Sequence, residues 1–194
     1  MWVLAWMSPR QGEWTEEDYL RIEATAFVEL VDGCLEFLPT PVPLHQLIAK
    51  FLARRLDEVV PSRYPGQVLP APCPIRLWPG RMREPDVYYV RPEQMPDLTQ
   101  PPNGAALAIE IVSEGEENRQ RDFVDKRRDY ARAGIKEYWI VDPEEETITV
   151  LTLGKKRYRL HGEFKPGDTA TSVLLPGFAV DVKSVFAAGR GKTR

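Results

Sequence analysis

Cysteine and histidine are scarce in this sequence, with only two of each among 194 residues. Cys34 and Cys73 form no CxxC pair, and the histidines are His45 and His161. This scarcity argues against a disulfide framework and against a structural zinc site. A bound metal ion would therefore be held by oxygen ligands.

The sequence also lacks a run of about 18 apolar residues, the length at which a membrane-spanning helix becomes a candidate. The apolar opening, residues 1–7, is far shorter than a span and shorter than the apolar core of a secretory signal. We therefore expect a cytoplasmic protein with no membrane partner.

A surplus of positive charge is missing as well. The formal net charge is −3 and the isoelectric point is near 5.6, whereas proteins that coat nucleic acids neutralise many phosphates with basic side chains. Nucleic-acid binding would then depend on local basic clusters, for which solvent-exposed surface charge is the alternative explanation. The clusters are Arg76, Arg81 and Arg83; Arg119, Arg121, Arg127 and Arg128; and Lys155, Lys156, Arg157 and Arg159.

The chain is long enough to bury one ordinary hydrophobic core, since 43% of its residues are hydrophobic. We find no internal repeat, low-complexity linker or break in composition. The sequence therefore predicts a single domain over residues 1–194. Residues 1–25 are expected to form an N-terminal segment with a short helix over 16–22, and residues 190–194 a flexible basic tail.

Apolar periodicity and turn signals predict an α+β fold. Asp32-Gly33 between two short apolar runs predicts a hairpin, and Pro43 opens a helical pattern that stops near Pro61. Gly134 predicts the end of a helix over residues 119–133. We expect a central mixed sheet flanked by helices, α/β/α-like, with an N-terminal hairpin and a C-terminal antiparallel extension. The expected strands are 67–69, 74–77, 87–91, 106–112, 136–141, 147–153 and 158–160.

Two carboxylates stand out because each lies in a β-type run that is otherwise mostly apolar. They are Asp86 in residues 84–90 and Glu110 in residues 107–113. Burying an unpartnered carboxylate costs on the order of several kcal/mol, so two of them on neighbouring strands indicate a shared cation. Mg²⁺ and Mn²⁺ prefer such oxygen ligands. For Asp86 the alternative is a role in capping a turn.

Lys126 lies on the helix predicted to follow the Glu110 strand. Two carboxylates and a lysine suit a metal-dependent phosphodiester hydrolase, because the ion lowers the pKa of a bound water and the lysine offsets charge on the phosphate. An ordinary helical ion pair with Asp122, four residues earlier, is the alternative role for Lys126.

Four further side chains are accessory candidates for the same site, each with a simpler explanation. Glu29 could face the site from the first hairpin or be an exposed strand charge. His45 could contact a phosphate from the start of its helix or lie on the helix surface. Ser113 could line the site or only cap a loop, and Asp122 could support Lys126.

The order and spacing of these motifs resemble the PD-(D/E)XK nuclease superfamily. Over almost the whole chain the sequence resembles one branch of it, the Uma-two family of putative restriction endonucleases. One departure is Glu114, which stands where the family commonly has proline. The stretches that carry the resemblance are residues 14–20, 28–33, 85–87, 110–113, 122–126 and 134–143.

The resemblance implies a restriction-endonuclease-like fold and cleavage of DNA with Mg²⁺ or Mn²⁺ as cofactor. It implies that Asp86, Glu110 and the backbone carbonyl of Ile111 hold the metal. Val112 occupies the usual position of the superfamily's lysine, and the resemblance implies that Lys126 on the following helix replaces it as the catalytic lysine.

DNA is the expected partner, with Arg119 and Arg83 as the predicted nucleic-acid contacts. A homodimer is expected because two sites related by a two-fold axis most simply cut both strands of a duplex. Two alternatives stay open: a non-catalytic nucleic-acid-binding or assembly module on the same fold, and a phosphoesterase for a small nucleotide, which suits the negative net charge.

Overall fold

The computed structural model describes residues 8–22 and 27–190. The apolar opening of the chain and all of the predicted basic tail except Arg190 lie outside these residues. Within them, no helix has the length and apolar character needed to cross a membrane.

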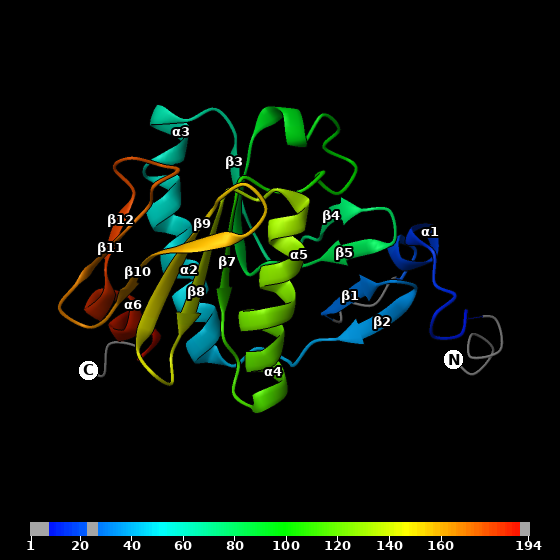
Figure 1. The fold of residues 1–194 in the computed structure, drawn as a ribbon, viewed down its shortest axis with the longest axis horizontal. Coiled ribbons are helices and arrows are strands. Elements are labelled where there is room, and N and C mark those ends of the chain that lie inside the picture. Colours follow the sequence, from blue (N-terminus) through cyan, green and yellow to red (C-terminus); the bar gives the residue numbers. More distant parts are fainter. Residues whose placement is uncertain (1–7, 23–26, 191–194) are drawn as a thin grey trace.

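A six-stranded mixed sheet forms the centre of the molecule (Figure 1). Its strands are ordered β10-β9-β8-β7-β6-β3, and only β7 and β8 pair in parallel. This confirms the predicted central mixed sheet. The strands are β3 (Gln67–Pro70), β6 (Val87–Val90), β7 (Leu107–Ile111), β8 (Glu137–Asp142), β9 (Thr147–Leu153) and β10 (Tyr158–Phe164).

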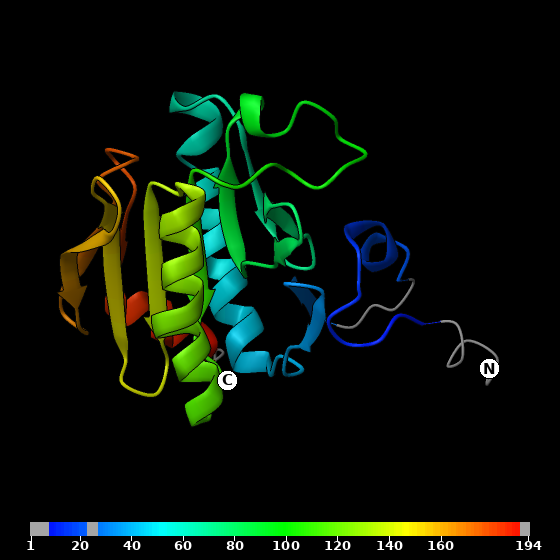
Figure 2. The same ribbon diagram turned by 45° about the vertical axis from the view of Figure 1, so that its right-hand side comes forward.

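Helices cover both faces of this sheet, as Figures 1 and 2 show. On one face lie α2 (Pro43–Asp57) and α6 (Val182–Gly189), which pack against each other. The apolar side of α2 buries Ile48, Leu52 and Leu56 completely against the sheet. The other face is covered by α4 (Glu116–Gln120), a π-helical turn (Arg121–Asp125) and α5 (Lys126–Ala133), which form one continuous helical segment.

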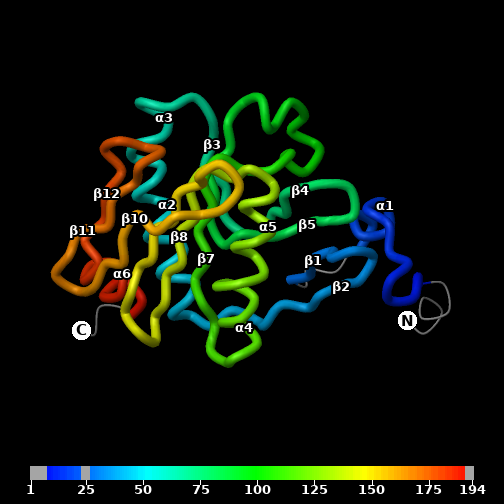
Figure 3. Tube along the Cα trace, viewed as in Figure 1, coloured from blue at the N-terminus to red at the C-terminus, as the bar shows by residue number. Residues whose placement is uncertain are grey.

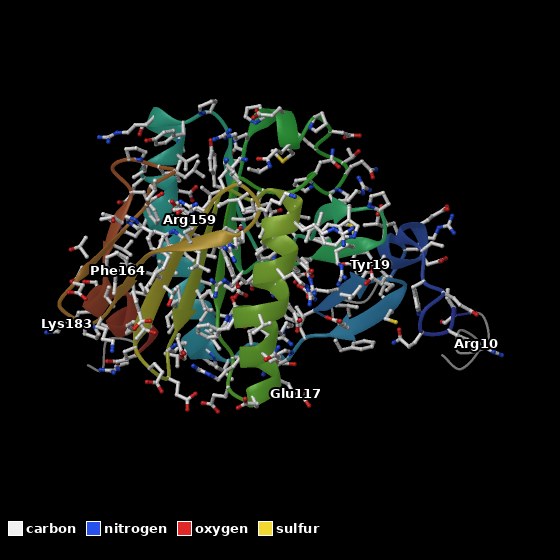
Figure 4. The ribbon with its side chains drawn as sticks, viewed as in Figure 1. Arg10, Tyr19, Glu117, Arg159, Phe164 and Lys183 are labelled. Carbon is white, nitrogen blue, oxygen red and sulfur yellow. The ribbon has the colours of Figure 1, made fainter. Side chains whose placement is uncertain are left out.

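A second, four-stranded sheet lies beside α5 and has the order β2-β1-β5-β4. The predicted hairpin forms part of it, with Asp32 and Gly33 both at positive φ in the turn. Helix α1 (Glu16–Leu20) packs on this sheet through Tyr19, whose hydroxyl donates to the carbonyl of Val28 at 2.8 Å (Figure 4). The strands are β1 (Val28–Val31), β2 (Cys34–Phe37), β4 (Ile75–Trp78) and β5 (Arg81–Arg83).

Several boundaries differ from the sequence-based expectation. Helix α2 ends at Asp57, and Pro61 instead lies in the first turn of the short α3 (Val60–Arg63), where a missing N–H is tolerated. The helix expected over 119–133 begins at Glu116 and contains the π-helical turn. Strand β5, the 3₁₀ turn Pro92–Gln94, the pair β11 (Thr169–Thr171) and β12 (Ala179–Asp181), and α6 were not predicted.

The parallel pair sets the place of the candidate site. Because β7 and β8 run in the same direction, their carboxyl ends meet at one end of the sheet. The chain then turns from β7 into α4, and α2 begins at this same end of the molecule (Figures 2 and 3). The side chains at the ends of these strands and the first turns of the two helices therefore face a common region.

Candidate active site

Glu110 lies on β7, and Asp86 directly precedes β6, the antiparallel neighbour of β7. Val87 pairs with Ile109, so the preceding Asp86 stands opposite Glu110. Oδ2 of Asp86 accepts a hydrogen bond from the backbone N–H of Ile111 at 2.7 Å and lies 3.1 Å from Nε2 of His45. In the described part of the chain, Oδ1 of Asp86 has no such partner and is free to act as a ligand.

Glu110 is almost completely buried, at 2% exposure. Its Oε2 lies 2.9 Å from Nζ of Lys126, and its Oε1 accepts a hydrogen bond from the hydroxyl of Tyr130. Burial raises the pKa of Glu110 well above its usual range, and the Lys126 ammonium offsets only part of this effect. The site therefore favours either a proton or a cation at Glu110.

Lys126 is surrounded by carboxylates. Besides Glu110, its Nζ lies 3.4 Å from Oε1 of Glu29 and 3.7 Å from Oδ1 of Asp122. Burial alone would lower the pKa of Lys126, but the neighbouring carboxylates, Glu110 first, outweigh burial and raise it. The side chain is therefore an ammonium. The predicted Asp122–Lys126 ion pair exists, but Glu110 is the nearer partner.

The π-helical turn before Lys126 explains how its side chain is placed. The backbone N–H of Lys126 bonds to the carbonyl of Arg121, five residues earlier, instead of to Asp122. The carbonyl of Asp122 accepts a hydrogen bond from the hydroxyl of Tyr138 on β8, at 2.8 Å. Such turns are frequent at functional sites. The extra residue in this turn sets the direction in which Lys126 leaves the helix.

Glu29 joins the site to a second buried charge network. It is fully buried, which rules out the alternative of an exposed strand charge. Its Oε1 accepts from the backbone N–H of Glu84 at 2.9 Å, and its Oε2 accepts from Arg83 at 2.6 Å. Despite burial, Lys126 and Arg83 hold the pKa of Glu29 below its usual value. Glu29 thus stays ionised and orients Lys126.

The predicted nucleic-acid contact Arg83 lies inside this network. Its side chain is only 2% exposed and also bonds to Asp129 at 2.7 Å and to Glu36 at 2.9 Å. With three carboxylates around it, the guanidinium is not available to a phosphate. Arg83 instead ties the small sheet to α5.

The other predicted contact, Arg119, is partly exposed but is also neutralised. Its side chain is 32% exposed and lies 2.7 Å from Asp142 and 3.5 Å from Glu144. The guanidinium also packs over the ring of Phe123. A phosphate at Arg119 would have to compete with these two carboxylates.

A small cavity of about 30 Å³ connects the central side chains, enough for one water-sized occupant. His45 lines it and is 8% exposed, so the alternative of a helix-surface histidine is wrong. Burial lowers the pKa of His45, but the hydrogen bond and charge of Asp86, together with Asp122 and the Ile111 backbone, outweigh burial and raise it. The polar and charged lining consists of His45, Glu84, Asp86, Glu110, Ser113, Arg121, Asp122 and Lys126.

Sequence reasoning missed Glu84. This side chain is 6% exposed, and within the described chain its Oε1 has no hydrogen-bond partner. Burial, with the nearby charge of Glu29, raises the pKa of Glu84 to about 7. The signal in the sequence was its spacing, because residues 84 and 86 of an extended chain point to the same side.

The donor set fits an ion of the magnesium type. The described residues contain no cluster of three or more acidic, histidine or cysteine side chains arranged to hold a metal. Mg²⁺, however, is usually bound by one or two carboxylates, with waters and substrate phosphates completing its shell. Asp86 offers a free Oδ1, and each oxygen of Glu110 keeps a second lone pair beside its present partner. Two carboxylates that meet in a polar cavity are sufficient for such an ion.

A mixed sheet flanked by helices, with paired carboxylates on adjacent strands and a lysine on the following helix, defines a restriction-endonuclease-like protein. The family model of Uma2, described as a putative restriction endonuclease, matches residues 16–183. The chain therefore belongs to this family.

A solved structure has the same fold. It is titled as the crystal structure of a putative nuclease belonging to DUF820 from Anabaena variabilis ATCC 29413. The TM-score is 0.72 at 16% sequence identity, and the match covers 91% of the present chain and 99% of the other. None of the curated proteins compared with the sequence matches it.

Proposed function

We propose that the chain is a metal-dependent endonuclease that hydrolyses phosphodiester bonds in DNA. The observation that carries this proposal is the cluster of Asp86, Glu110 and Lys126. Its two carboxylates and one ammonium line the same cavity. Membership of a family described as putative restriction endonucleases supports DNA as the substrate.

In this proposal Asp86 and Glu110 hold Mg²⁺ or Mn²⁺, with the backbone carbonyl of Ile111 as a third protein ligand. When bound, the ion would lower the pKa of a water and offset charge on the phosphate. The N–H of Ile111 and the ring of His45 fix the Asp86 carboxylate, and the Tyr130 hydroxyl fixes Glu110.

The ammonium of Lys126 is placed to stabilise the charge that develops on the phosphate when water attacks. Glu29 and Asp122 hold this ammonium in place, and Ser113 lines the cavity as a further polar group. Because these contacts exist before any substrate binds, little reorganisation is needed at the moment of reaction.

A calorimetric titration with Mn²⁺ tests the proposal without knowledge of the DNA sequence that is cut. We expect saturable binding in the wild type and its loss in Asp86→Asn, since an amide is a weaker ligand than a carboxylate. Cleavage of plasmid and oligonucleotide DNA should disappear in the same variant. Absence of binding in both proteins, even with a short duplex added, would favour the non-catalytic module.

A phosphoesterase acting on a small nucleotide is the second candidate. The net charge of −3 favours it, as do the carboxylates that neutralise Arg83 and Arg119. Salt distinguishes the two enzymes, because binding of a duplex through several phosphates weakens steeply as salt rises and binding of a small substrate does not. The homodimer and the cytoplasmic location stay predictions, and sedimentation of the purified protein tests the former.

A further inference from the structure

A groove of about 570 Å³ adjoins the candidate active site and is not used by the proposed chemistry. It is bounded by residues 39–45, which lead into α2, by residues 112–119 between β7 and α4, and by residues 142–144 after β8. Pro39, His45 and Ser113 line both this groove and the central cavity. A ligand chain bound in the groove would therefore place an adjacent group at the edge of the central cavity.

Apolar side chains line part of the groove, and some of them are exposed. Val42 is 58% exposed and Leu44 is 37% exposed, and the other apolar walls come from Pro39, Val112 and Pro143. Val42 is the N-cap residue of α2 and makes no capping bond with its side chain. Apolar side chains of this kind can pack against a flat ring.

The charged side chains of the groove are mainly acidic, and Thr40, Ser113 and Asn118 add neutral polar groups. Glu114, Asp142 and Glu144 line the groove, and Arg119 is already engaged by the last two. Phosphates of a duplex backbone would meet these carboxylates and be repelled. Carboxylates instead accept hydrogen bonds from base amino groups, such as N4 of cytosine. The lining therefore suits the edge of a base and disfavours a phosphate.

We propose that this groove binds an unpaired nucleobase of the DNA strand, next to the phosphate held at the central cavity. The volume lies within the range of small-ligand pockets, and unstacked bases are commonly held between apolar or aromatic side chains and read at their polar edges. This inference rests on the proposed nuclease function and narrows its substrate to a strand with at least one unpaired nucleotide.

Binding measurements with labelled 12-nucleotide DNA in Ca²⁺ test the pocket, with gels to verify that the DNA stays intact. The wild type should bind a single strand about tenfold more tightly than a duplex of the same length. In a series with one abasic site moved along the strand, one position should lose about tenfold in affinity, as expected when one stacked base is removed.

Val42→Trp should fill the groove from an exposed position and weaken single-strand binding about tenfold. It should also flatten the abasic profile, that is, the dependence of affinity on the position of the abasic site. Val173→Trp is the matched control, since Val173 is 51% exposed and lies outside the groove. Circular dichroism and thermal melting verify that both variants fold. The abasic series in the wild type needs no variant and tests the pocket even if Val42→Trp unfolds.

A flat abasic profile in the wild type, a preference for the duplex, or an unchanged profile in folded Val42→Trp would each overturn the nucleobase pocket. Hydrolysis of bis(4-nitrophenyl) phosphate with Mn²⁺ tests the catalytic proposal separately, because this compound carries no nucleobase. Absence of that hydrolysis alongside a position-dependent abasic profile would contradict the nuclease and leave the pocket supported.

Discussion

Lys126 and Glu110 form a buried ion pair in which Nζ lies 2.9 Å from Oε2 and both side chains are 3% exposed. The lysine reaches this glutamate from a helix, whereas Val112, two residues after Glu110, carries no charge. The spatial relationship between ammonium and carboxylate is thus provided by the tertiary structure instead of by neighbouring positions on one strand.

Removal of the Lys126 ammonium should damage both stability and cleavage. In Lys126→Ala the carboxylates of Glu110, Glu29 and Asp122 lose their shared cation, so we expect the free energy of unfolding to fall by about 3 kcal/mol without metal. Mn²⁺ should restore part of this loss but not DNA cleavage. Urea unfolding with and without Mn²⁺, and a cleavage assay, measure these effects. Lys183→Ala, at an exposed position, serves as control. Retained DNA cleavage in Lys126→Ala would show that Lys126 is not a catalytic residue.

Metal affinity should rise with pH. Burial raises the pKa of Glu110 above its usual range, so protons compete with an incoming ion for this carboxyl up to a higher pH than at an ordinary glutamate. While one proton is displaced, affinity should increase about tenfold per pH unit. Calorimetry in two buffers with different ionisation enthalpies counts the protons released. Affinity independent of pH between 6 and 8, with no proton release, would show that Glu110 is already ionised.

Glu84 should make the metal-free protein less stable as pH rises. Its pKa is about 7 in the folded protein and about 4.5 when unfolded, so the folded state binds more protons between these values and stability falls as pH increases through this window. Glu84→Gln should remove this loss, raising the free energy of unfolding at pH 8 by about 1–3 kcal/mol and changing little at pH 4.

Thermal melts of Glu84→Gln across that pH range provide the measurement. The exposed Glu163→Gln is the matched control and should stay within about 0.5 kcal/mol of the wild type at each pH. A gain that is equal at pH 4 and pH 8 would show that the effect does not come from ionisation of Glu84.

Arg83 should behave as a structural residue. Arg83→Ala leaves Glu29 and Asp129 without their shared guanidinium, and we expect a loss of about 3–5 kcal/mol in the free energy of unfolding. The exposed Arg128→Ala should cost about 0.5 kcal/mol or less. Chemical denaturation compares the two. A stable Arg83→Ala protein that has lost only DNA affinity would restore the sequence-based assignment of Arg83 as a nucleic-acid contact.

Local sequence signals were sufficient for much of the fold. Asp32-Gly33 specified the hairpin because both residues adopt positive φ, and Gly134 ended its helix in the left-handed conformation. Asp86 and Glu110 were identifiable because burying a charge in an apolar strand costs free energy unless a partner compensates it. These features depend on the residues themselves and their immediate neighbours.

Features that depend on distant residues were missed. Strand β5 has the sequence Arg81-Met82-Arg83, which looks exposed, yet all three residues are buried because carboxylates far away in the chain pair with the two arginines. The burial of His45 and Glu29 is likewise decided by contacts across the fold. The pattern of apolar residues along the sequence does not predict such ion pairs between distant residues.

Because of the π-helical turn Arg121–Asp125, the number of residues in this segment matters as well as their identity. Each residue of an α-helix turns the chain by about 100°. Deleting one residue from this turn would restore regular helical bonding and turn the segment from Glu116 to Gln120 relative to Lys126 by that angle. Arg119 pairs with Asp142, and Lys126 pairs with Glu110. After the deletion these two ion pairs could no longer form at the same time. A single additional backbone unit thus keeps Lys126, the proposed catalytic lysine, in register with the sheet.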